Sequence, residues 1–240
     1  QGAELHRLMN RTARLNGLTI HSVNSSYTTD GPDLGSGDFS FLEKPRILML
    51  TGSGISSSTV GQAWFLLDNR FDIPVTLVDA DQFGSIDLSK YNTMILTGRV
   101  ARSGEAKLKE WIRGGGNVVA LSLANSYLQS VDVISYSRVS REKSEEGDES
   151  KPKIRAYADR GNDRKGTSIP GSIFEANLDL THPIAYGYTN PKLSVFRSGT
   201  EFIQPSKDAY ANPVYFTDDP LQSGFINDEN LEMLKGSVSV

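Results

Sequence analysis

Residues 47–54 read ILMLTGSG, an apolar run that ends in a threonine and a glycine-rich turn. The run is continuous rather than alternating, which is typical of a strand covered on both faces of a parallel sheet. Thr59 and Gln62 follow at the spacing of a helical capping box. One apolar stripe at helical spacing begins beside them and consists of Val60, Ala63, Trp64 and Leu67. The stretch therefore predicts a strand, a tight turn and a helix.

Three further apolar runs occupy residues 75–78, 94–96 and 118–121, and each predicts a strand. Between the last two runs, Ser103 can cap a second helix that the glycines at 114–116 end. The apolar face of that helix consists of Leu108, Trp111 and Ile112. The order strand, helix, strand, strand, helix, strand predicts an α/β fold with a flavodoxin-like open parallel sheet.

The sequence also predicts two regions of different kinds. Residues 1–43 form an N-terminal appendage or linker, with a helix over 3–15 and a strand at 18–20. Residues 44–240 form the α/β domain. Its last residues, Ser237 to Val240, alternate like a strand without a closing turn, so we expect the domain to be truncated at this end.

The second half of the domain is less regular. Residues 138–165 are rich in mixed charge and predict a long solvated loop. Residues 193–196 and 214–216 read as strands, and Asn227 can cap a short helix. The acidic pair Asp218-Asp219 is interpreted as a turn before a proline. The aromatic residues of this half are interpreted as core and edge packing rather than as a ligand platform, and they are Tyr186, Tyr188, Phe196, Tyr215 and Phe216.

The composition excludes several classes of function. The 240 residues include no cysteine, which excludes disulfides, thiolate zinc sites and cysteine nucleophiles. The net charge of -4, without a basic cluster, argues against nucleic acid as a partner. No apolar run approaches the roughly 18 residues of a membrane span.

A ligand site is one hypothesis for the first turn. Gly52-Ser53-Gly54 lies between a strand and a helix, where backbone amides can hold a phosphate. Asp79 ends the next strand, where a dinucleotide-binding fold places its ribose-binding acid. Ser57 stands where the third glycine of G-x-G-x-x-G would be, so a plain tight turn over Gly52 to Ser58 is the competing interpretation.

Ser122 is a second candidate, because it follows a strand as the nucleophile of α/β hydrolases does. Ala120 and Ala124 replace the glycines of G-x-S-x-G. His182 is the one histidine inside the predicted domain, so it is the candidate base. Asp179 precedes His182 by three residues, but Pro183 disfavours a shared helical face and no second histidine is near. No metal site is predicted.

Several ordered stretches resemble a known family. The chain is similar to the class I glutamine amidotransferase-like domain that follows the catalytic domain in bacterial M14-family zinc carboxypeptidase-like proteins. The resemblance covers most of residues 44–240. The matching stretches are residues 45–50, 61–68, 71–80, 87–92, 111–116, 178–188, 223–226 and 230–231.

The resemblance implies a domain without chemistry of its own. Active class I amidotransferases use a Cys-His-Glu triad, whereas this chain has no cysteine, and Ile184 follows His182-Pro183 where the acid should be. The zinc of the parent protein would lie upstream of Gln1, so we expect no cofactor in this chain. The implied function is a non-catalytic accessory domain, periplasmic or secreted, that packs on the upstream peptidase domain or binds a partner or substrate. The alternatives are a serine hydrolase using Ser122 and a small-molecule or nucleotide module at the Gly52 turn.

Overall fold

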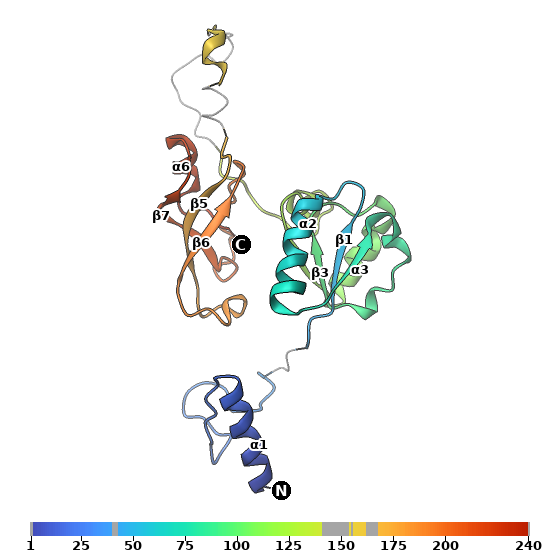
Figure 1. Ribbon diagram of the computed structural model, residues 1–240, viewed down its shortest axis with the longest axis vertical. Coiled ribbons are helices and arrows are strands. Elements are labelled where there is room, and N and C mark those ends of the chain that lie inside the picture. The colour runs from blue at the N-terminus through green and yellow to red at the C-terminus, as the bar shows by residue number, and fades with distance from the viewer. Residues whose placement is uncertain (1, 40–42, 141–153, 155, 162–167, 240) are drawn as a thin grey trace.

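The computed structural model describes residues 2–39, 43–140, 154, 156–161 and 168–239. Figure 1 shows three parts in chain order: a segment with helix α1 (Gly2–Leu15), an α/β unit and a smaller unit of strands. We call residues 43–135 the parallel unit. We call residues 136–140 and 168–239 the antiparallel unit.

The parallel unit is built on one four-stranded sheet. Its strands are β1 (Ile47–Thr51), β2 (Val75–Asp79), β3 (Thr93–Leu96) and β4 (Asn117–Ala120). They lie in the order β2-β1-β3-β4, and each neighbouring pair is parallel. This is the strand order with which flavodoxin-like sheets begin. The predicted fold class, an α/β flavodoxin-like open parallel sheet, is confirmed.

Helices cover both faces of this sheet because its strands are apolar on both sides. On one face, Ile47 and Met49 pack with Val60 of α2 (Ser57–Trp64). On the other, Leu48 and Leu50 pack with the two helices α3 (Glu105–Arg113) and α4 (Ala124–Ser130). A π-helix, η1 (Phe65–Arg70), continues α2 directly. Three 3-10 helices complete the unit: η2 (Ala80–Ser85), η3 (Leu88–Lys90) and η4 (Arg102–Gly104).

Two predicted helix caps are wrong. The N-cap of α2 is Ser56, whose hydroxyl accepts from the backbone N–H of Thr59, so the capping box Thr59–Gln62 does not form. Ser103 lies inside η4, and α3 begins after Gly104 without a side-chain cap. Serines stand at several neighbouring positions before α2, and the geometry of the turn decides which hydroxyl reaches the free amides.

The antiparallel unit is a second sheet, which the sequence did not predict. It contains β5 (Ser172–Leu178), β6 (Lys192–Arg197) and β7 (Val214–Ser223) in the order β6-β5-β7. Helix α6 (Asp228–Leu234) follows, with Asn227 as its N-cap as predicted. Short 3-10 helices lie at η5 (Tyr157–Asp159) and η6 (Pro183–Ala185). The rings of Phe174 and Phe216 meet edge to face at 6.1 Å in the core.

Isolated pairings widen this second sheet beyond its three strands. Val238 pairs with Tyr215 of β7 on one side and with Ile203 on the other. Ile203 in turn pairs with Arg138. Residues 237–239 therefore lie between β7 and residue 203, and the strand-like pattern predicted for Ser237 to Val240 is found as far as residue 239.

Several smaller predictions are corrected. Residues 18–20 form no strand and are exposed. Asp218 and Asp219 lie within β7 rather than in a turn. Phe216 is buried as predicted, but four other aromatic residues are exposed: Tyr186, Tyr188, Phe196 and Tyr215. Most of the predicted loop at 138–165 lies outside the described residues. None of the described helices is both long and apolar enough to span a membrane.

Candidate functional site

The candidate residues of the parallel unit gather at the carboxyl edge of its sheet. Thr51 at the end of β1 is paired with Asp79 at the end of β2. The other neighbouring strands end at the same level, because Met49 of β1 pairs with Ile95 of β3, and Leu96 of β3 pairs with Ala120 of β4. The turns that follow these strands therefore begin at the same level. Ligands of open α/β sheets bind at this edge, where the strand order reverses, which here is between β1 and β3.

Gly52 and Asp79 lie together, as their places in the sequence indicate. Gly52 has a φ of +92°, and a Cβ at this position would lie 2.7 Å from Asp79 Oδ2. The Asp79 carboxylate also accepts the backbone N–H of Asp81 at 2.9 Å and caps η2. Ser53 and Gly54 are exposed, and Gly54 has a φ of +77°. The turn thus places the Asp79 carboxylate against Gly52, while Ser53 and Gly54 remain exposed to solvent.

The loop after β3 touches this turn. A Cβ at Gly98 would lie 2.8 Å from Ile55 Cδ1 and 2.9 Å from the carbonyl oxygen of Gly54. Thr97, just before Gly98, is 1% exposed, and its hydroxyl has no hydrogen-bond partner in the described structure. Arg99 and Arg102 follow on the surface. Sequence reasoning missed these three residues, because a threonine at the end of an apolar run and two arginines in the following loop carry no specific signal.

Ser122 occupies a strand-to-helix turn with an unusual backbone. Its φ is +56°, a left-handed value that residues other than glycine seldom adopt. The residue is exposed and lies between β4 and α4. The backbone therefore has the shape of a nucleophile elbow. Its hydroxyl has no hydrogen-bond partner among the described residues, so no base is placed against it.

His182 belongs to the antiparallel unit. It follows β5 and caps η6, where its Nδ1 accepts the backbone N–H of Ile184 at 3.2 Å. The nearby Asp179 carboxylate accepts from the hydroxyl of Thr181 at 2.7 Å. This bond, with the Thr181 backbone N–H, lowers the pKa of Asp179. Both side chains are thus engaged in local turns, and no described contact joins His182 to Ser122.

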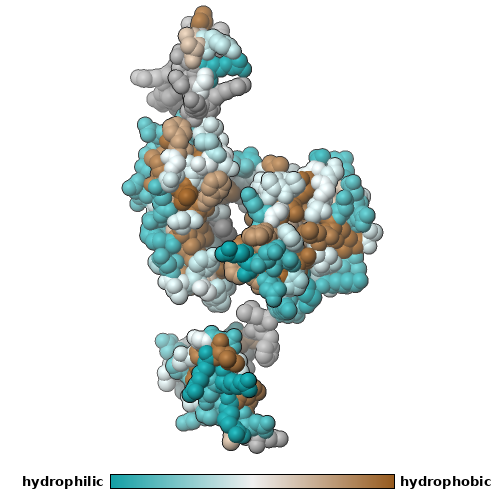
Figure 2. Space-filling view, viewed as in Figure 1, coloured by the Kyte–Doolittle hydropathy of each residue, from teal (hydrophilic) through white to brown (hydrophobic). Residues whose placement is uncertain are grey.

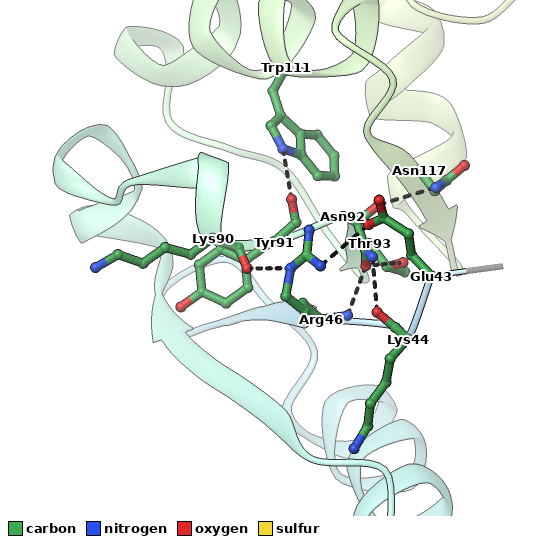
Figure 3. A network of polar contacts seen from close by, with 9 residues as sticks. All are labelled: Glu43, Lys44, Arg46, Lys90, Tyr91, Asn92, Thr93, Trp111 and Asn117. Carbon is green, nitrogen blue, oxygen red and sulfur yellow. Dashed lines mark hydrogen bonds and ion pairs between the residues drawn. The ribbon is translucent and has the colours of Figure 1, made fainter. Parts of the chain in front are cut away.

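A broad hollow of about 750 Å³ lies at the opposite, amino edge of the parallel sheet. Figure 3 shows its polar lining around Asn92, at the starts of β1, β3 and β4. The Asn92 side chain accepts from the backbone N–H of Arg46 at 2.8 Å and donates to the Lys44 carbonyl at 3.0 Å. The indole N–H of Trp111 donates to the Leu88 carbonyl at 3.1 Å. These groups join the strand starts to one another, so we interpret the hollow as structural.

Metal ligands are not assembled in the part of the chain that the structure describes. There, no three histidine, aspartate or glutamate side chains are placed to hold a metal ion. Asp218 and Asp219 line an acidic hollow beside the Lys192–Glu175 ion pair of 2.8 Å. The carboxylates in this hollow thus face a lysine of the same unit.

The chain was compared with protein-family models, curated proteins and solved structures. No protein-family model matches the chain, and no curated protein matches it. Among solved structures it is similar to a ThuA-like protein from Parabacteroides merdae ATCC 43184, with 16% sequence identity and a TM-score of 0.41. The match covers 67% of this chain and 63% of that one, so the chain aligns with less than two thirds of that protein. The fold class rests on the strand order described above.

Proposed function

We propose that this chain is a non-catalytic accessory domain of a larger zinc-carboxypeptidase-like protein, periplasmic or secreted. The observation that carries the proposal is the separation of Ser122 from His182. Ser122 lies at the carboxyl edge of the parallel sheet, whereas His182 lies in a turn of the antiparallel unit. A serine is a weak nucleophile unless an adjacent base activates it. The sequence resemblance supplies the link to a peptidase, and the lack of cysteine removes the amidotransferase triad.

Exposed apolar surface supports a role in packing on another domain. Phe65 and Leu66 at the start of η1 are 53% and 50% exposed, and Phe71 after it is 63% exposed. Trp64, which ends α2, is also partly exposed. Figure 2 shows apolar side chains on the visible face of both sheet units. Gathered apolar surface of this kind is typical of interaction sites.

The proposal is tested on the native polypeptide that contains this sequence. Its mass and its zinc content are measured after purification from the source cells. We expect a polypeptide much larger than 240 residues that carries zinc, with the metal outside this chain. A native chain no longer than this one and free of zinc would contradict the proposal.

A second candidate is a serine hydrolase that uses Ser122. The left-handed backbone at Ser122, in a strand-to-helix turn, is the observation that favours it. The test is covalent labelling of the purified chain with a fluorophosphonate. Labelling that disappears in Ser122→Ala, but persists in the neighbouring Ser130→Ala control, would replace the accessory role with catalysis. The accessory proposal expects no labelling of either protein.

A further inference from the structure

Two exposed aromatic rings lie on the outer face of the antiparallel sheet. Tyr215 of β7 is 43% exposed and Phe196 of β6 is 71% exposed. Their partners on the central strand β5 are Asn177 and Ile173. Paired residues of antiparallel strands share a face, and these two partners alternate with the buried residues of β5. Both rings therefore face solvent on one side of the sheet, about 13 Å apart along β5.

The Phe196 ring is supported on one side. A Cβ at Gly171 would lie 3.0 Å from Phe196 Cζ, so the ring rests against the backbone at this glycine. This contact positions the ring while most of its surface stays in solvent. The faces of aromatic rings carry partial negative charge and attract C–H groups, which have the opposite polarity. An exposed and supported ring is thus a platform for a ligand surface that is rich in C–H groups.

A hollow of about 530 Å³ opens beside Tyr215 on the same face. Lys192, Asn177 and Tyr215 cross it in one row, because Asn177 pairs with both of the others. Glu175 lies two positions along β5 and accepts from Lys192 Nζ at 2.8 Å. The side chains of Asn177 and Tyr215 have no hydrogen-bond partner among the described residues. The hollow therefore offers a free amide and a free phenol, and both groups can donate and accept.

One side of the hollow is a bulge in β7. This strand leaves its pairing with β5 between Phe216 and Leu221. Bulges redirect side chains, and the residues here include Asp218 and Asp219, which both line the hollow and are exposed. The bulge thus adds two carboxylates beside the row of Lys192, Asn177 and Tyr215.

Lysines offset part of this negative charge. Lys192 is paired with Glu175. The pKa of Lys235 is raised by its hydrogen bond to Glu232 and also by the charges of the two aspartates, so its ammonium group lies within their field. With ammonium groups beside its carboxylates, the hollow fits a ligand without net charge better than an anion or a polycation.

We propose that the outer face of the antiparallel sheet binds a neutral oligosaccharide. A sugar ring combines C–H faces with hydroxyl groups, and this sheet face presents aromatic rings beside an amide, a phenol and an ion pair. One sugar packs on Tyr215 and bonds through its hydroxyls to Asn177 and Glu175, and a sugar further along the oligosaccharide packs on Phe196. The site goes beyond the accessory role and needs only residues of the antiparallel unit.

The test is titration of the full chain with cellotetraose, maltotetraose and the N-acetylated chitin tetrasaccharide, each followed by ¹⁵N–¹H NMR. We expect at least one of them to give saturable shifts at residues 173–177, 192–196 and 215–219. Tetragalacturonate and tetralysine carry negative and positive charge, and neither should give saturable shifts there.

Three outcomes of these titrations would overturn the proposal. The first is the lack of saturable shifts with all three neutral sugars, and the second is tighter binding of tetragalacturonate or tetralysine. The third is a set of shifts at the same residues when the protein is diluted without sugar, which would show that this face binds a second copy of the chain. None of these outcomes bears on the zinc content of the parent polypeptide.

Variants separate a ligand role from a structural one. Tyr215→Ala and Phe196→Ala should each weaken binding by about tenfold, whereas Tyr215→Phe keeps the ring and should stay within about threefold of the wild type. Asn177→Ala should also weaken binding by about tenfold, because it removes hydrogen bonds to the sugar. Tyr210→Ala, which removes an 88% exposed ring outside the sheet, is the matched control and should bind like the wild type.

Thermal unfolding of each variant distinguishes lost binding from lost folding. A folded Tyr215→Ala or Phe196→Ala that binds like the wild type would overturn the proposal. Equal losses in Tyr210→Ala and Tyr215→Ala would overturn it as well.

Discussion

Gly52 holds the turn after β1 in a conformation that a larger residue cannot share. Its φ is +92°, and a Cβ would meet the Asp79 carboxylate at 2.7 Å. Gly54 has a similar φ of +77°, but open space surrounds the place of its Cβ. Gly52→Ala should therefore combine backbone strain with a clash, whereas Gly54→Ala should show strain alone.

We expect Gly54→Ala to lower the free energy of unfolding by about 1–2 kcal/mol, from left-handed strain. Gly52→Ala should cost about 1–3 kcal/mol more, as strained and overpacked sites do. Urea unfolding of both variants measures the difference. Adding Asp79→Ala to Gly52→Ala should recover the excess, and equal losses in the two single variants would contradict the role of Asp79.

Single residues differ in how far their roles can be predicted from sequence. Gly52 and Asp79 were predicted to follow and to end two consecutive strands, and the structure places the Asp79 carboxylate against Gly52. Thr97 could not be found in this way, since a threonine that ends an apolar run looks the same with or without a hydrogen-bond partner. The strained φ of Ser122 was likewise invisible, because Ala120 and Ala124 remove the glycines that usually mark such a turn.

At the scale of elements, Asn92 joins the starts of three strands. Its side chain bonds to the backbone of Arg46 and Lys44 before β1, and its carbonyl accepts from Asn117 at the start of β4. Asn92→Ala should lower the free energy of unfolding by about 1–3 kcal/mol, because it leaves backbone groups unpaired at the sheet edge. Chemical denaturation measures this loss. Asn16→Ala, which removes one exposed bond after α1, is the control and should change little.

The segments 136–138 and 201–203 are joined by a pH-dependent contact. Burial alone would raise the pKa of Glu201, but bonds from Arg138 and Tyr136 outweigh it and hold the pKa below its ordinary value of 4.5. A carboxyl group with a lowered folded pKa stabilises the protein above its unfolded pKa. That contribution is lost as the pH falls from about 4.5 through the folded pKa.

We therefore expect the stability of the antiparallel unit to decline more steeply below pH 4.5 in the wild type than in Glu201→Gln. The glutamine cannot titrate, so the difference between the two proteins isolates this carboxyl group. Thermal unfolding at a series of pH values measures it. Parallel curves for the two proteins throughout this range would show that Glu201 contributes nothing.

Elements were predictable where their pattern was uniform. The four parallel strands were all found, because each leaves a short continuous apolar run, although the edge strands β2 and β4 are partly exposed. β5 was missed, since Glu175 and Asn177 on its outer face interrupt the apolar residues that fill its core face. The pairing of β5, β6 and β7 in a sheet of their own depends on contacts between distant segments, which no local pattern records.

At the scale of the whole molecule, the described residues of the parallel unit and of the antiparallel unit pack in separate hydrophobic clusters. Leu108 is fully buried in the core of the parallel unit, and Phe174 is fully buried in that of the antiparallel unit. Leu108→Ala and Phe174→Ala should each destabilise their own unit, by about 2–5 and 3–5 kcal/mol. Native-state hydrogen exchange should show each loss confined to amides of the same unit. A single cooperative transition, lowered equally by both changes, would show that the units unfold together.

The placement of residues 237–239 between β7 and residue 203 has a consequence for the order of folding. Residues 237–239 pair with segments that precede them in the chain, at Tyr215 of β7 and at Ile203. These pairings can form only after residues 237–239 have been synthesised. Until residues 237–239 arrive, β7 and residue 203 each present an unpaired edge, and such edges recruit strands from other chains. A nascent or cleaved chain that lacks this short segment is therefore the species most exposed to aggregation.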